Sequence, residues 1–290
     1  MKIGVLASGN LGLDVLGKIN SDYDISFVLT DKASNDILKL CKENKIPFFI
    51  GNPRNGIGYN FIKNICVDII VSINYLFLIE KDIIQHSRLI TFNIHGSLLP
   101  KYRGRTPHVW AIINNENETG ITAHVIDENC DSGEIITQIK IPINENDTGN
   151  DLLNKYKSEY YHIVKNVFDK AVSGQLQLNK QDENLATYFG VRNPDDGEIN
   201  WNWQRERIQN WVRAQSFPYP GAFTYYNGFK ITIDEVVKSP LGFSCNEVNG
   251  NILEVIPNIV VKTQNGALEI KKYREKVKFA IGEKLGNYEK

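Results

Sequence analysis

Short, strongly apolar segments alternate with helix-like segments over the first hundred residues. The apolar runs are "KIGVLAS", "DISFVLT", "VDIIVSIN" and "LITFNIH", and amphipathic stretches such as "SNDILKLCKEN" and "EKDIIQHS" stand between them. Strands that are apolar at nearly every position are buried on both faces, and a helix between two strands is the usual connection in a parallel sheet. The predicted fold class is therefore α/β, a doubly wound Rossmann-like parallel sheet.

The rest of the chain predicts two more strands, a long helix and a second domain. "ETGITAHVID" and "GEIITQIKIPI" have strand patterns, and the helix that follows is expected to begin at Asp147 or Thr148 as N-cap. After a polar stretch, Asn-Gly pairs separate alternating runs, which is typical of antiparallel hairpins. We expect a first domain over 1–180, a linker with embedded turns over 181–203 and a small β domain over 204–290.

Composition and charge exclude several classes of protein. The net charge of the 290 residues is −1, which gives no overall reason to expect a nucleic acid or membrane partner. No signal peptide and no apolar run of bilayer length is present in the sequence, so a cytoplasmic location is expected. The four cysteines are widely separated and lack histidines at ligand spacing, so neither a metal nor a disulfide framework is expected.

Two polar residues stand at the end of the fourth apolar run. Asn93 and His95 are two residues apart, so a strand would present both on one face, and ligands of open α/β sheets bind at the carboxyl ends of strands. A single histidine in such a place is more often a hydrogen-bonded core residue. The motifs that follow favour a functional interpretation.

These motifs give the chain a resemblance to the formyltransferases that use N10-formyltetrahydrofolate. That family includes methionyl-tRNA formyltransferase, glycinamide ribonucleotide transformylase and the sugar-nucleotide N-formyltransferases. The matching residues, in the order of the family pattern, are Asn93 and His95, Ser97 to Pro100 with Arg103 and Gly104, Thr119 and Gly120 with Thr122, and Asp131 with Gly133. Several motifs in the correct order are far more specific than any one alone. The resemblance covers the whole chain and implies an OB-like fold for the last domain.

Formyl transfer to an amine requires donors for an oxyanion and an acceptor for a proton. Asn93 and a protonated His95 are the expected oxyanion donors, and Asp131 is expected to accept the amine proton through His95 or a water. Asp131 alone would be interpreted as a turn residue, because Asp-x-Gly is common in turns. Its order and spacing after Asn93 and His95 favour the catalytic role. No metal is required.

The resemblance also implies binding residues and a cis Leu99-Pro100 peptide. The folate pterin is expected to contact backbone groups around Leu76, Phe77 and Ile79, which could also be simply a buried strand end, and the loop from Asp127 to Asp131, which includes Glu128. His124 is expected to orient that loop or to contact the cofactor, or else to be structural. The turn Ser8, Gly9, Asn10 and Leu11 is expected to approach the phosphates of the acceptor, or to be an ordinary strand-to-helix turn. Further acceptor-binding candidates are Arg103 and Arg105, with a surface salt bridge as the alternative, and Trp110 and Tyr219, for each of which packing between the domains is the more common role.

The acceptor expected is the amine of a nucleotide-linked amino-6-deoxysugar used in glycan or O-antigen synthesis. "FGVRNPDDGEINWNW" and "YRGRTPHVWAIIN" resemble segments of such enzymes. A methionyl-tRNA formyltransferase is the nearest competing function, but from Arg205 onward the chain has only 13 basic against 9 acidic residues. A formyltetrahydrofolate hydrolase and a non-enzymatic folate sensor also have to be weighed against the sugar enzyme. The nucleotide (dTDP, UDP or GDP), the amino position of the sugar and the oligomeric state stay open, although the resemblance suggests a homodimer.

Overall fold

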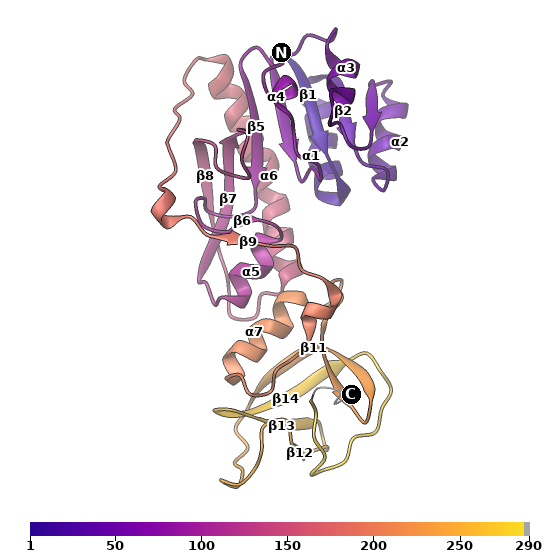
Figure 1. The fold of residues 1–290 in the computed structure, drawn as a ribbon, viewed down its shortest axis with the longest axis vertical. Coiled ribbons are helices and arrows are strands. Elements are labelled where there is room, and N and C mark those ends of the chain that lie inside the picture. The colour runs from indigo at the N-terminus through magenta and orange to yellow at the C-terminus, as the bar shows by residue number, and fades with distance from the viewer. Residues whose placement is uncertain (287–290) are drawn as a thin grey trace. The chain divides into compact units, whose positions relative to one another are not determined.

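The computed structural model describes residues 1–286, which fall into two compact units. The first unit comprises Met1–Gly104, Thr119–Ile141 and Asn154–Phe189, and the second comprises Arg105–Glu118, Pro142–Leu153 and the chain from Gly190 onward. Figure 1 shows the elements of both units along the chain.

The first unit is built on a seven-stranded sheet of order β3-β2-β1-β4-β5-β7-β8. The strands are β1 (Lys2–Ala7), β2 (Asp24–Thr30), β3 (Phe48–Ile50), β4 (Ile69–Ile73), β5 (Ile90–His95), β7 (Glu118–Val125) and β8 (Ile135–Pro142). Pairing is parallel from β3 to β5, as predicted. Strand β7 then runs antiparallel to β5, a reversal that the hydrophobic pattern does not distinguish.

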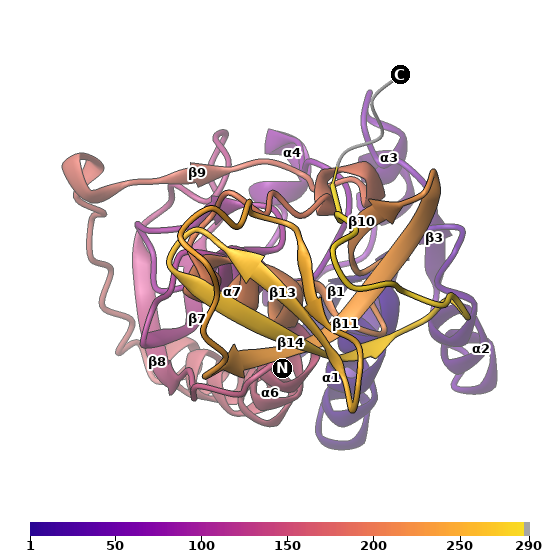
Figure 2. The same ribbon diagram turned by 90° about the horizontal axis from the view of Figure 1, so that it is seen from below.

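Helices cover both faces of this sheet. They are α1 (Gly9–Asp22), α2 (Asn35–Glu43), α3 (Ile57–Ile62), α4 (Lys81–Ile84) and α6 (Gly149–Val172). Figure 2 shows α3 and α4 on one side of the sheet and α1 and α6 on the other. On the first side, Ile62 of α3 and Ile83 of α4 pack with Leu6, Phe27 and Ile70 of the strands, and all five are fully buried. This confirms the doubly wound arrangement.

The long helix α6 begins where the sequence predicts. The Thr148 hydroxyl accepts a hydrogen bond from the Asp151 N–H (3.1 Å), while the Asp151 carboxylate accepts from Thr148 N (3.0 Å). This reciprocal pair satisfies two backbone donors of the first turn. The hydrophobic pattern predicts no element over residues 45–66, where the structure has the short β3 and α3, because three residues of strand and six of helix give too little periodicity.

The polar stretch after α6 has more order than its composition indicates. It contains two short 3-10 helices, η1 (Glu183–Leu185) and η2 (Pro194–Gly197), and the strand β9 (Tyr188–Phe189). In the first unit β9 pairs in parallel with the two-residue strand β6 (Arg103–Gly104). A segment whose composition predicts a linker therefore contributes a strand to the region directly after β5.

The second unit combines two helices with an antiparallel sheet of order β10-β11-β14-β13-β12. Its elements are α5 (Pro107–Ile113), α7 (Arg205–Gln215), β10 (Ala222–Tyr226), β11 (Phe229–Ser239), β12 (Ile252–Glu254), β13 (Ile259–Thr263) and β14 (Gly266–Tyr273). Figure 1 shows α7 against this sheet. Asn227 and Gly228 both have positive φ (47° and 81°), as a tight hairpin turn requires, which confirms the predicted Asn-Gly turn.

Candidate active site

Asn93 and His95 lie on one face at the end of β5, as predicted. The antiparallel register pairs Asn93 with His124 of β7 and His95 with Thr122. The Asn93 side-chain nitrogen lies 3.1 Å from His124 Nε2, and His124 Nδ1 lies 2.9 Å from the Val125 carbonyl oxygen. A carbonyl can only accept, so Nδ1 of His124 carries the proton and Nε2 accepts from Asn93. This bond uses one of the two amide hydrogens of Asn93 and orients the other.

His95 is held by the backbone that follows the strand. Its Nε2 donates to the carbonyl oxygen of Tyr102 at 2.8 Å, and the residue is only 6% exposed. Because Nε2 carries the proton in this bond, Nδ1 is the ring nitrogen that is not bonded to Tyr102. That nitrogen lies 3.5 Å from Oδ1 of Asp131.

Asp131 completes the cluster from the loop after β7. Its Oδ1 lies 3.5 Å from His95 Nδ1 and 3.6 Å from His124 Nε2, and its Oδ2 accepts from the Gly104 N–H at 2.9 Å. The φ of Asp131 is +55°, in the left-handed region that non-glycine residues rarely adopt. The three residues predicted to be catalytic, Asn93, His95 and Asp131, are thus brought together within the first unit.

The protonation states follow from burial and from these contacts. Burial lowers the pKa of His95 below its usual value, and the neighbouring Asp131 carboxylate opposes this only in part. For Asp131, burial acts to raise the pKa, but the attraction of His95 and the hydrogen bond from the Gly104 N–H hold it well below the usual range. The Gly104 N–H acts whatever the charge of His95, so Asp131 is an anion at neutral pH.

The turn after β5 is stabilised by groups from β7 and β8. The Leu99-Pro100 peptide is cis, as predicted. The Thr122 hydroxyl donates to the Ser97 carbonyl oxygen (2.6 Å), and the Gln138 side chain donates to the Leu99 carbonyl oxygen (2.9 Å). These bonds account for Thr122 in the motif, because they fix the turn that carries the chain from His95 to Tyr102.

Arg103 is placed differently from the prediction. Its side chain is completely buried, and its guanidinium forms a bidentate ion pair with Glu183 (2.7 and 2.9 Å) and hydrogen bonds to Gln181 and Tyr188. An arginine whose donors are engaged in this way does not present its charge to a phosphate, so we withdraw Arg103 from the acceptor-binding residues. Gln181 and Glu183 were missed because they lie in the polar stretch predicted to be a linker.

An ion pair links the loop predicted to hold the pterin to the start of α4, which follows the other predicted segment. Lys81, at the start of α4, lies 3.3 Å from Glu128, and both side chains are largely exposed. Asp127 accepts from Ser132 Oγ (2.9 Å) and Asn129 N (3.1 Å), which closes the loop that leads to Asp131. Between β4 and α4, Leu76 is exposed, while Phe77 and Ile79 are partly buried. Among the predicted folate residues, His124 contacts both Asn93 and Asp131 of the catalytic cluster.

The turn after β1 is tightly bonded within the first unit. The Gly9 N–H donates to the Ser34 hydroxyl (2.9 Å), which donates to the Asp31 carboxylate (2.6 Å). Ser8 and Leu11 are buried, whereas Gly9 and Asn10 are exposed at the start of α1. An acidic side chain beside this turn works against an approaching phosphate. The phosphate-binding role of Ser8 to Leu11 stays a prediction.

The remaining acceptor-binding candidates belong to the second unit. Arg105 is exposed. The Trp110 indole N–H donates to the Gly190 carbonyl oxygen (3.3 Å), and the guanidinium of Arg192 lies 5.1 Å from its ring centre. The Tyr219 hydroxyl lies 2.8 Å from His108 Nε2, and burial raises the pKa of Tyr219 to about 12. Both aromatic residues therefore have packing roles within their own unit.

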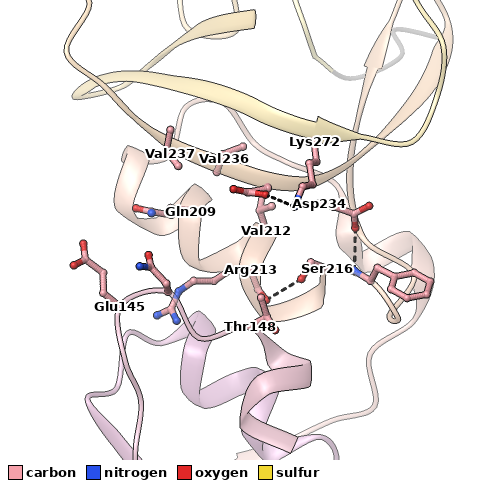
Figure 3. A pocket seen from close by; sticks show the side chains of 13 residues that line it. Glu145, Thr148, Gln209, Val212, Arg213, Ser216, Asp234, Val236, Val237 and Lys272 are labelled. Carbon is pink, nitrogen blue, oxygen red and sulfur yellow. Dashed lines mark hydrogen bonds and ion pairs between the residues drawn. The ribbon is translucent and has the colours of Figure 1, made fainter. Parts of the chain in front are cut away.

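A cavity of about 560 Å³ lies in the second unit, between α7 and β11, and is lined by none of the predicted site residues (Figure 3). Two of its acidic side chains already have partners: Glu235 lies 2.8 Å from Lys272, and Asp234 accepts from the Phe217 N–H (2.9 Å). Within residues 1–286, no group of three or more His, Cys, Asp or Glu side chains is arranged to hold a metal. In the same range, no helix is long and apolar enough to cross a membrane.

Comparison with known proteins identifies the family. Residues 1–168 match the formyl transferase family model, and residues 192–284 match the model of the formyl transferase C-terminal domain. The chain is 25% identical to WlaRD, a sugar 3N-formyl transferase crystallised with dTDP and 5-N-formyl-THF, with a TM-score of 0.73 over 96% of this chain and 99% of that one.

Two further structures share the fold. An N-formyltransferase from Helicobacter canadensis, in complex with folinic acid and dTDP-3-aminofucose, is 23% identical with a TM-score of 0.74 and covers 94% of this chain and 100% of its own. Methionyl-tRNA formyltransferase from Clostridium thermocellum is 19% identical with a TM-score of 0.57 and covers 82% and 94%. Both family models match in the expected order, with the Asn93, His95 and Asp131 cluster inside the first. The chain belongs to the formyl transferase family.

Proposed function

We propose that this enzyme transfers a formyl group from N10-formyltetrahydrofolate to the amine of a nucleotide-linked amino-6-deoxysugar. The observation that carries the proposal is the cluster of Asn93, His95 and Asp131, in a chain similar over almost its full length to a sugar 3N-formyl transferase. We assign the chemistry to residues 1–180 and an OB-like domain to 204–290, with 181–203 as the connection, of which β9 belongs to the first unit. A role in glycan or O-antigen synthesis follows from this substrate class.

The roles of the cluster follow from which of its atoms are already bonded. Asn93 donates one amide hydrogen to His124, so its second amide hydrogen is assigned to the oxyanion that forms when the amine attacks the formyl carbon. His95 was also expected to donate to that oxyanion as an imidazolium. We replace that role, because its Nε2 is bonded to Tyr102, its Nδ1 edge faces Asp131 and its pKa is lowered by burial.

In this scheme His95 and Asp131 handle the proton. The attacking amine must lose a proton before the tetrahedral intermediate collapses, and tetrahydrofolate must gain one at N10 as it leaves. Asp131 is anionic and lies beside His95 Nδ1, so a proton taken up at that nitrogen, or by a water bound to Asp131, is stabilised by the carboxylate. The same pair then returns a proton to the leaving nitrogen.

We assign the class of acceptor from the similarity of the chain to solved structures and not from the shape of a binding pocket. The WlaRD and Helicobacter structures match this chain with TM-scores of 0.73 and 0.74, against 0.57 for methionyl-tRNA formyltransferase. The C-terminal part also lacks the strong basic excess expected of a tRNA-binding domain. The nucleotide, the amino position, a homodimer and a cytoplasmic location stay predictions.

The test is an end-point assay with N10-formyltetrahydrofolate and a panel of dTDP-, UDP- and GDP-linked 3-amino and 4-amino sugars. Tetrahydrofolate release and product mass are followed together. We expect a gain of one formyl group on at least one sugar. Transfer only to methionyl-tRNA would replace the proposal with a methionyl-tRNA formyltransferase, and formate release that needs no acceptor would replace it with a hydrolase. Folate binding without any turnover would indicate a sensor.

A further inference from the structure

Gln181 bridges the buried Arg103 and the loop that carries Asp131. Its side-chain nitrogen donates to the carbonyl oxygens of Asp131 (2.9 Å) and Gly133 (2.8 Å), and its side-chain oxygen accepts from Arg103 Nη2 (2.8 Å) and Nε (3.2 Å). A guanidinium only donates and a carbonyl only accepts, so the orientation of this amide is fixed by its partners. All four hydrogen-bonding positions of the amide are used.

Arg103 is itself held rigidly, so it is a suitable anchor. Glu183 pairs with it through both carboxylate oxygens, and the Tyr188 ring lies 5.2 Å from its guanidinium carbon. The backbone next to it is fixed as well, because Tyr102 N donates to the Thr187 hydroxyl and Arg103 N donates to the Thr187 carbonyl oxygen, both at 2.8 Å. Residues 181–189 thus hold Arg103 through both its side chain and its main chain.

Asp131 depends on such support. Its backbone is in the left-handed region (φ +55°), and the side chain of Ser132 is turned back to Asp127. The Gly104 N–H positions one oxygen of the Asp131 carboxylate, while Gln181 holds its backbone carbonyl. Removing the Gln181 amide would release the Asp131 and Gly133 carbonyls together and allow the carboxylate to move away from His95.

We propose that Gln181 is a positioning residue for this site: it couples the buried Arg103 to the Asp131 loop and so sets the distance between the Asp131 carboxylate and His95 Nδ1. Gln181 acts through Asp131 and is not expected to touch either substrate. The kinetic consequence rests on the proposed function, whereas the geometric consequence for the two histidines does not.

Two variants separate the two halves of the bridge. Gln181→Leu removes both the hydrogen bonds to Arg103 and those to the Asp131 loop, and the leucine side chain is of similar size to glutamine. Gln181→Glu keeps oxygens for Arg103 but has no hydrogen to donate, so a carboxylate would face the Asp131 and Gly133 carbonyls. If the contact with Arg103 alone mattered, Gln181→Glu would behave like the parent enzyme. The matched control is Gln177→Leu, an exposed glutamine four residues earlier in the same stretch.

The kinetic readout is the split between kcat and KM in the tetrahydrofolate-release assay. For both Gln181 variants we expect kcat to fall about tenfold or more, as is typical of a displaced catalytic group, with each KM within about twofold. Gln177→Leu should match the parent. Equal kcat in Gln181→Glu and the parent, or a loss fully accounted for by unfolded protein in thermal melts, would overturn the proposal.

The second readout needs no substrate. The chain has only five histidines, so the ring signals of His95 and His124 can be followed by NMR through a pH titration. The groups that act on His95 are the Asp131 carboxylate, the Tyr102 carbonyl oxygen, the Arg103 guanidinium and the neighbouring His124 ring. Moving the carboxylate away removes the group that favours the charged ring, so Gln181→Leu, which adds no charge, should shift the His95 midpoint to lower pH, by about half a unit or more. Unchanged His95 and His124 signals would refute the positioning role even if no sugar amine were ever formylated.

Discussion

Replacing Asp131 by asparagine removes one charge and little else. Asparagine retains an oxygen that can accept from the Gly104 N–H, so the loop keeps its anchor while the anion beside His95 Nδ1 disappears. At the observed 3.5 Å, two unit charges interact by about 5 kcal/mol with an effective dielectric constant of ~20. The Asp131 side chain is 13% exposed, so solvent screens part of this. We take ~3 kcal/mol as the loss when His95 carries the proton, which corresponds to a turnover lower by about 100-fold or more.

The assay is steady-state and single-turnover release of tetrahydrofolate with the best sugar acceptor. Because the interaction develops only as the proton moves, we expect kcat to carry the loss and KM to change little. The matched control is Asp169→Asn, which removes an exposed carboxylate of α6 that pairs with Lys165; it should leave turnover unchanged. If Asp131→Asn keeps turnover within about threefold of the parent, less than 1 kcal/mol, the assignment of the proton to this pair is wrong.

Three further changes test other parts of the structure. Asn93→Ala should lower turnover by about 100-fold or more through loss of an oxyanion donor; near-normal tetrahydrofolate release would contradict this. Gly104→Ala should lower the free energy of unfolding by at least ~1 kcal/mol, because φ is +101° and the new Cβ would lie 2.2 Å from the Phe189 carbonyl oxygen; an unchanged urea midpoint would refute it. Burial lowers the pKa of His108 to about 4. As pH falls from about 6.5, the unfolded chain therefore protonates His108 before the folded chain does. The free energy of unfolding should then decrease towards pH 4 by up to ~1.4 kcal/mol per pH unit. Urea unfolding of His108→Gln should give a shallower slope, and an equal slope would contradict the assignment.

Much of the first unit is predictable because its strands are buried on both faces. Runs such as that of β4, in which all five residues are buried, leave little choice of secondary structure. The positions of Asn93 and His95 also follow, since the period of two places both on one face. The direction of β7 does not follow, because an apolar run carries no sign of direction. The partner of Asn93 was therefore not predicted: His124 was assigned to folate, although the register places it opposite Asn93.

Arg103 shows why motif order predicts a site better than it predicts roles. The motif identifies an arginine near the catalytic residues, and an arginine near a substrate phosphate is a reasonable expectation. Its partners are 78 to 85 residues further along the chain, in a stretch whose Asn, Asp and Gly content is typical of linkers. Composition shows that these residues are polar. It does not show that they bind a buried arginine.

The arrangement around Tyr102 and Gly104 explains how two catalytic groups, one at the end of β5 and one in the loop after β7, keep a constant separation. Tyr102 accepts from His95 through its carbonyl oxygen, and Gly104 donates to Asp131 through its N–H, so one tripeptide contacts both groups. Both residues have positive φ (+61° and +101°), which turns the carbonyl of one and the N–H of the other to their partners. If the tripeptide moves, His95 and Asp131 move with it and their distance is preserved. Two independent anchors would add their fluctuations instead. The buried Arg103 between them is therefore placed where fixing one side chain restrains both members of the pair.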